Sequence, residues 1–129
     1  EVTEVNEMLQ GMELFNGIFV CTTNLMDRID QAALRRFTFK IRFKPLTAAQ
    51  REKMFVTEAL AGDASLLTEA TRGRLAKMDQ LCPGDFAAVK RQVDILAAEF
   101  SVAEFLEQLE AEHRIKPEVR EARNIGFLP

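Results

Sequence analysis

Three hydrophobic patterns follow one another along the first third of the chain. Apolar residues recur at helical spacing over residues 2–15, which predicts an amphipathic helix. Ile18–Thr22 is a continuous apolar run, typical of a strand that is buried on both faces. Phe37–Phe43 alternates apolar and polar residues throughout, which is typical of a half-exposed strand near a sheet edge. With a short helix between the two strands, residues 1–44 are predicted to form helix–strand–helix–strand.

The rest of the chain has a helical pattern, so residues 45–129 are predicted to form a small helical bundle. Thr47 and Gln50 have the spacing of a capping box, and so do Ser101 and Glu104. Each box predicts a helix that starts directly after the Thr or the Ser. The predicted fold class is therefore an α/β part followed by an all-α part, predominantly helical overall.

Two more helices are expected between these boxes. Ser65 can cap a helix that runs to about Met78. Pro83 opens another helix, whose apolar face continues as far as Phe100. Pro117 is expected to end regular structure and to leave an irregular or short helical tail.

The composition argues against several classes of protein. The 129 residues carry a net charge of −3, which does not suit a general nucleic-acid coat protein. No apolar run approaches the ~20 residues that span a bilayer, and no signal peptide opens the chain, so no membrane partner is expected. The two cysteines do not make a disulfide framework, which favours a reducing cytoplasm. His113 is the single histidine, which argues against histidine-based metal clusters or catalytic triads.

Candidate chemistry lies beside the two predicted strands. Asn24 follows the first strand, and its neutral amide can contact a terminal phosphate and orient an attacking water. An Asn after a strand is also a common turn former. Arg35 and Arg36 end the short helix, where cations interact favourably with the helix dipole. The alternative for this pair is an arginine finger that reaches the phosphate of a neighbouring subunit.

The ordered motifs resemble a known family. Residues 18–24 (IFVCTTN) and 29–37 (IDQAALRRF), preceded by residues 6–17, are similar to the second region of homology of AAA-type ATPases. This resemblance implies that Asn24 is the sensor 1 residue and that Arg35 or Arg36 is the finger. In the family, Pro-Gly-Arg-Phe-Asp often surrounds the second arginine, whereas here Arg36 runs directly into Phe37. The shortening resembles a bacterial branch of the family, and we favour Arg36 as the finger.

The resemblance also implies a fold and a nucleotide contact in the second part. Residues 1–44 would be the C-terminal piece of a P-loop NTPase parallel sheet, and residues 45–129 a four-helix lid with a tail. By the resemblance, Gly84 and Asp85 match the region of the lid that contacts the nucleotide. A Gly at a helix start suits such a contact, since it allows close backbone approach. Lys90 and Arg91 follow within two turns, and a solvated basic face is the alternative for them.

An AAA-type identity implies ATP and Mg²⁺ as cofactors of the full-length protein. The phosphate-binding loop and the metal site would lie upstream of Glu1, so the chain alone is expected to be inactive and without bound nucleotide. The expected partners are other copies in a ring, often a hexamer, and an unknown protein substrate. Two alternatives stay open: a degenerate module that serves assembly, and a clamp-loader-type protein that acts on DNA, although the acidic charge does not favour nucleic acid as a partner.

Overall fold

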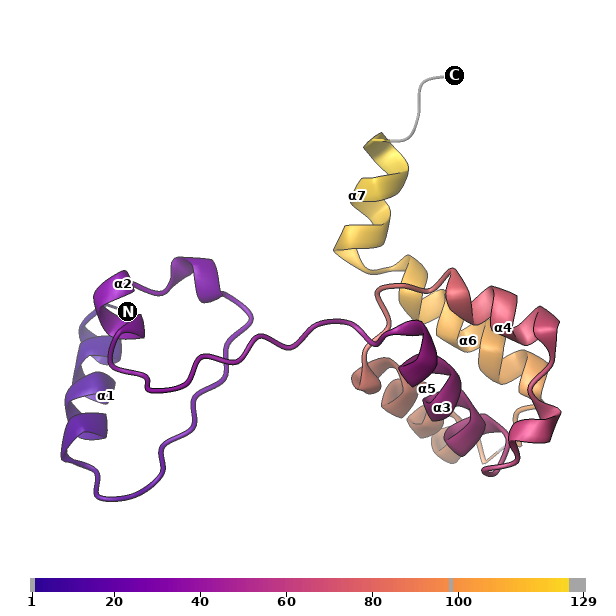
Figure 1. Ribbon diagram of the computed structural model, residues 1–129, viewed down its shortest axis with the longest axis horizontal. Helices are drawn as coiled ribbons and strands as arrows, with labels where there is room; N and C mark the ends of the chain where they lie inside the picture. Colours follow the sequence, from indigo (N-terminus) through magenta and orange to yellow (C-terminus); the bar gives the residue numbers. More distant parts are fainter. Residues whose placement is uncertain (1, 98, 126–129) are drawn as a thin grey trace. The chain divides into compact units, whose positions relative to one another are not determined.

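The computed structural model describes residues 2–97 and 99–125 (Figure 1). Over these residues the chain is all-α, with seven α-helices, two 3-10 turns and no β-strand. The predicted α/β part, with its two strands of a parallel sheet, is therefore wrong. The chain divides into two compact units, Glu1–Arg42 and Phe43–Pro129.

The first unit contains three short helical elements. Helix α1 spans Val2–Leu14, a 3-10 turn spans Met26–Arg28, and α2 spans Gln31–Leu34. Among the described side chains of this unit, Leu9 of α1 and Ala33 of α2 are the buried ones. A core of this size supplies little apolar burial, so the unit depends weakly on hydrophobic packing.

The two predicted strands are irregular chain in the structure. Ile18 is 90% exposed and Phe43 is 91% exposed, although the pattern predicted burial for the first strand and a half-buried face for the second. Within the described residues, no backbone hydrogen bond joins Ile18–Thr22 to Phe37–Phe43. A strand is stable only when a neighbouring backbone satisfies its N–H and C=O groups. Neither segment pairs with the other, so neither forms a strand despite its hydrophobic pattern.

In its described residues, the second unit is a bundle of five α-helices, and one 3-10 turn, Ala64–Leu66, precedes the second of them. The helices are α3 (Ala48–Ala59), α4 (Glu69–Ala76), α5 (Pro83–Leu96), α6 (Val102–Arg114) and α7 (Pro117–Ile125). Helix α3 packs on α4 and on α5, α5 packs on α6, and α7 contacts α6 (Figure 1).

The core of the bundle contains two phenylalanines in contact. The rings of Phe55 from α3 and Phe105 from α6 lie edge to face, with centroids 5.9 Å apart and planes at 80°. Edge-to-face pairs are favourable because the positive ring edge meets the negative ring face. The other buried apolar side chains of this core are Leu60, Leu75, Met78, Leu81, Phe86, Val89, Leu106 and Leu109.

Both predicted capping boxes are present. The Thr47 hydroxyl accepts from the backbone N–H of Gln50, and the Gln50 side chain accepts from the backbone N–H of Thr47. The equivalent pair of bonds joins Ser101 and Glu104 at the start of α6. The two boxes fix the first turns of α3 and α6 and satisfy backbone donors that a helix leaves free.

Three helix boundaries differ from the prediction. Thr68 caps α4, whereas Ser65 lies in the preceding 3-10 turn. Helix α5 stops at Leu96, because Ala97 adopts a left-handed conformation with φ of 47° that ends the helix before Phe100. Pro117 begins α7 instead of ending regular structure, and a Pro fits the first turn because that N–H has no helical partner.

Candidate functional site

Asn24 lies at an exposed bend between irregular chain and the first 3-10 turn. The Thr23 hydroxyl accepts a hydrogen bond of 2.9 Å from the backbone N–H of Leu25, so the bend is fixed by its neighbours. This local geometry agrees with the turn-forming alternative. It also leaves Asn24 at the surface, where its amide can reach a ligand.

Arg35 and Arg36 lie in the turn that ends α2, and both are exposed. A guanidinium nitrogen of Arg36, Nη1, is 3.3 Å from Oε1 of Glu13 on α1. Both side chains are largely exposed, so this ion pair contributes at most about 1 kcal/mol and opens readily. Within the described residues, no hydrogen bond or ion pair joins Asn24 to either arginine, so the structure does not assemble one site from the three.

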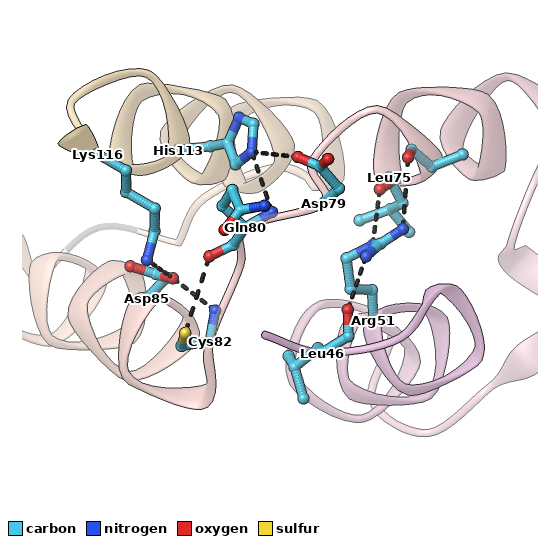
Figure 2. Close-up of polar contacts among 10 residues, drawn as sticks. Leu46, Arg51, Leu75, Asp79, Gln80, Cys82, Asp85, His113 and Lys116 are labelled. Atoms are coloured by element: carbon cyan, nitrogen blue, oxygen red, sulfur yellow. Dashed lines mark hydrogen bonds and ion pairs between the residues drawn. The ribbon is translucent and has the colours of Figure 1, made fainter. Parts of the chain in front are cut away.

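The first turn of α5 contains Gly84 and Asp85. Oδ2 of Asp85 accepts a hydrogen bond of 2.7 Å from the backbone N–H of Cys82 (Figure 2). The same oxygen lies 2.8 Å from Nζ of Lys116, which stands between α6 and α7. The Asp85 carboxylate is therefore already paired, whereas Gly84 is exposed and a Cβ there would meet no atom within 4 Å. Packing does not require a glycine at position 84.

His113, near the end of α6, contacts the loop that precedes α5. Its Nε2 atom accepts a hydrogen bond of 3.2 Å from the backbone N–H of Gln80 and lies 3.5 Å from Oδ1 of Asp79 (Figure 2). Burial lowers the pKa of His113, and the bond and charge of Asp79 oppose that shift in part. The ring is therefore neutral at pH 7, with its proton on Nδ1.

Arg51 is the buried cation of the bundle, with only 6% of its surface exposed. Its Nε donates to the carbonyl of Leu75 at 2.9 Å, and its other nitrogens donate to Leu46 at 2.7 Å and Ala76 at 3.3 Å (Figure 2). The charge thus lies at the C-terminal end of α4, which a cation stabilises. The backbone N–H of Leu46 donates to the carbonyl of Leu81, so both backbone groups of Leu46 are fixed.

Lys90 points towards α3, because its Nζ lies 2.7 Å from Oε2 of Glu58. The hydrogen bond to Glu58 raises the pKa of Lys90. Arg91 is exposed. This placement agrees with the solvated basic face that the sequence offered as the alternative for these two residues.

Three polar contacts of the helical unit were not found from the sequence: those of Arg51, Lys116 and His113. Their partners lie far along the chain, 24 residues from Arg51 to Leu75 and 33 residues from His113 to Gln80. No local spacing signals such contacts.

The described residues contain no group of three His, Cys, Asp or Glu side chains that could hold a metal ion together. None of the helices in that part of the chain combines the length and the apolar character needed to cross a bilayer. No family model, curated protein or solved structure compared with the chain matches it. The motifs at Asn24 and Arg35–Arg36 are therefore the basis for assigning a function.

Proposed function

We propose that this chain is the C-terminal part of a cytoplasmic AAA-type ATPase subunit. Its ring of identical subunits would couple ATP binding and hydrolysis to the remodelling of a protein substrate. The observation that carries the proposal is the ordered series of motifs from Thr22–Asn24 to Asp30 and Arg35–Arg36. The exposure of Asn24, Arg35 and Arg36 supports it, because each side chain is accessible to a nucleotide.

Asn24 acts within its own subunit in this proposal. Its amide contacts the terminal phosphate and orients the attacking water without adding negative charge to an already anionic site. Phosphoryl transfer depends mainly on such positioning and on stabilising charge. ATP brings the transferable phosphoryl group with its Mg²⁺, and no step is assigned to a metal held by the described residues.

Arg36 acts on the nucleotide of the neighbouring subunit. A guanidinium can donate two parallel hydrogen bonds to phosphate oxygens, where negative charge grows during transfer. For this contact Arg36 must first separate from Glu13, which costs little free energy because the ion pair is exposed to solvent. Arg35, one residue earlier in the same turn, is the alternative finger.

Gly84 and Asp85 would be the nucleotide contact of the helical unit. Gly84 keeps the backbone of the first turn of α5 open, so a ligand can approach the N–H of Gly84. The helical unit would change its position with the nucleotide state and transmit force to the substrate.

Mixing two inactive full-length variants tests the division of roles. Asn24→Ala removes the residue that acts within the subunit, and Arg36→Ala removes the one that acts across the interface. In randomly mixed rings, an interface is intact when one subunit keeps Asn24 and its neighbour keeps Arg36, so about one quarter of wild-type ATP turnover should return. Arg28→Ala, an exposed arginine of the same unit, is the control for each variant.

Mixtures that stay as inactive as each variant alone would contradict a finger that acts between subunits. A wild-type full-length protein that does not bind or hydrolyse ATP would favour the non-catalytic assembly module instead.

A further inference from the structure

A cleft of the helical unit lies between the α4–α5 loop, the C-terminal end of α6 and helix α7. Its volume is about 540 Å³, within the range of ~300–1,000 Å³ that is usual for ligand clefts. Each of the three segments contributes a basic side chain to the lining, namely Lys77, Arg114 and Arg123. None of the residues proposed for ATP turnover lines this cleft, so it needs an explanation of its own.

Three cations of the cleft lie near a single carboxylate. Nε and Nη2 of Arg74 donate to the two carboxylate oxygens of Glu110 at 2.7 Å and 2.8 Å. The hydrogen bond from Arg74 lowers the pKa of Glu110, and the charges of Arg114 and Lys77 lower it further. Because Arg74 already engages both oxygens of Glu110, this carboxylate does not neutralise Arg114 and Lys77 as well.

The remaining charges leave the cleft with an excess of cations. Among the described residues, Lys77, Arg114 and Arg123 form no ion pair, and all three are exposed. The carboxylates of the lining other than Glu110 are Asp79 and Glu118. Four Lys or Arg therefore stand against three Asp or Glu in this cleft, whereas the whole chain has a net charge of −3. An anionic group is favoured here against the charge of the chain.

A neutral donor and apolar side chains complete the lining. The Nδ1–H of His113 makes no hydrogen bond to the described residues, and no fully buried nitrogen or oxygen of their side chains lacks a partner. Nδ1 is therefore accessible, and His113 lines the cleft. From α7, Val119 and Ala122 line it three residues apart, on one side of the helix. A ligand that fits must present apolar groups beside its anionic ones.

We propose that this cleft binds an acidic segment of a partner protein, one that carries both carboxylate and apolar side chains. The carboxylates pair with Lys77 and Arg114, and the apolar side chains lie against Val119 and Ala122 of α7. The carboxylates of the cleft disfavour a ligand made of phosphates alone, because like charges repel at short range. Binding needs neither ATP nor the residues proposed for its turnover.

The experiment measures, by fluorescence polarisation, the dissociation constant of a labelled hexapeptide, Glu-Leu-Glu-Glu-Leu-Glu, for the full-length protein. The double variant K77Q/R114Q should weaken binding about five- to tenfold, since two ion pairs are lost. The control K53Q/R91Q removes the same charge from exposed sites outside the cleft and should bind like the wild type. Glu118→Gln should tighten binding about two- to threefold, because it removes a repelling carboxylate.

Several results would overturn the inference. A wild-type protein that binds the peptide no better than its Gln-for-Glu version would show that the cleft does not select carboxylates. Equal losses in the two double variants would show that only net charge matters. Sodium phosphate that displaces the peptide better than potassium chloride of equal ionic strength would make the cleft a phosphate site instead.

Glu118→Gln keeps the inference testable if K77Q/R114Q does not fold, since unchanged or weaker binding in that variant contradicts it. ATP turnover by the wild type is a separate readout. A protein that hydrolyses ATP without binding the peptide refutes this inference and leaves the proposed function intact.

Discussion

The imidazole of His113 accepts a hydrogen bond from the backbone N–H of Gln80, with 3.2 Å between the two nitrogens. A protonated imidazole has no acceptor atom, so this bond exists only while the ring is neutral. The ring is also faced by Asp79 and Asp85, which favour protonation, and by Lys116, which opposes it. Burial outweighs the carboxylates and lowers the pKa of His113.

The stability of the helical unit should therefore depend on pH below neutrality. The pKa of His113 in the folded protein lies below the ordinary value of about 6.5, so the unfolded chain binds the proton more readily. The contribution of the neutral His113 ring to the free energy of unfolding is complete above pH ~6.5. It is lost as the pH falls through the pKa of His113 in the folded protein. Urea unfolding at a series of pH values measures it, with His113→Gln as the control that cannot titrate. Equal pH dependence in both proteins would contradict this role.

Arg51→Met should destabilise the helical unit by about 2–4 kcal/mol. The substitution removes three hydrogen bonds to backbone carbonyls, including the buried bond to Leu75. Arg72→Met is the matched control, because Arg72 pairs with Glu52 at the surface and should cost less than about 1 kcal/mol. Chemical denaturation gives both values, and similar losses for the two variants would contradict a special stabilising role of the buried Arg51 hydrogen bonds.

Two glycines of the helical unit should respond to alanine in opposite directions. Gly73 lies inside α4 with nothing within 4 Å of an added Cβ, so Gly73→Ala should stabilise by about 0.5–1 kcal/mol. Gly62 has φ of +85°, which strains any other residue, so Gly62→Ala should destabilise by about 1 kcal/mol. Melting temperatures of the two variants provide the check. A shift of the same sign in both would contradict either the helical conformation of Gly73 or the left-handed conformation of Gly62.

Features fixed by near neighbours in the sequence were predictable. The capping boxes at Thr47 and Ser101 need only residues three positions apart, and both form as predicted. The prediction of two strands was wrong because a strand depends on a second backbone that pairs with it. The alternation of Phe37–Phe43 is a local pattern and does not provide that partner. Local conformation also moved boundaries, as at Ala97, where a left-handed residue ends α5.

The residues of the candidate site and its surroundings also divide into those with a local sequence signal and those without one. Asn24, Arg36 and Gly84 are proposed as site residues from the ordered motifs and the family resemblance they carry. Lys116 could not be assigned, because its partner Asp85 lies far away in the sequence and only the packing of α6 beside α5 joins them. Contacts between residues far apart in the sequence have no signature in the spacing of neighbouring residues, so the sequence does not predict them.

ATP turnover by Arg36→Ala in the full-length protein tests the central claim most directly. The dissociation constant for ATP should stay within about twofold of the wild type, whereas kcat should fall about 10³-fold or more, because the finger acts only on the charge that develops in transfer. Arg35→Ala, measured alongside, decides which arginine carries the role. Normal turnover in both variants would contradict the assignment of an arginine finger to this turn.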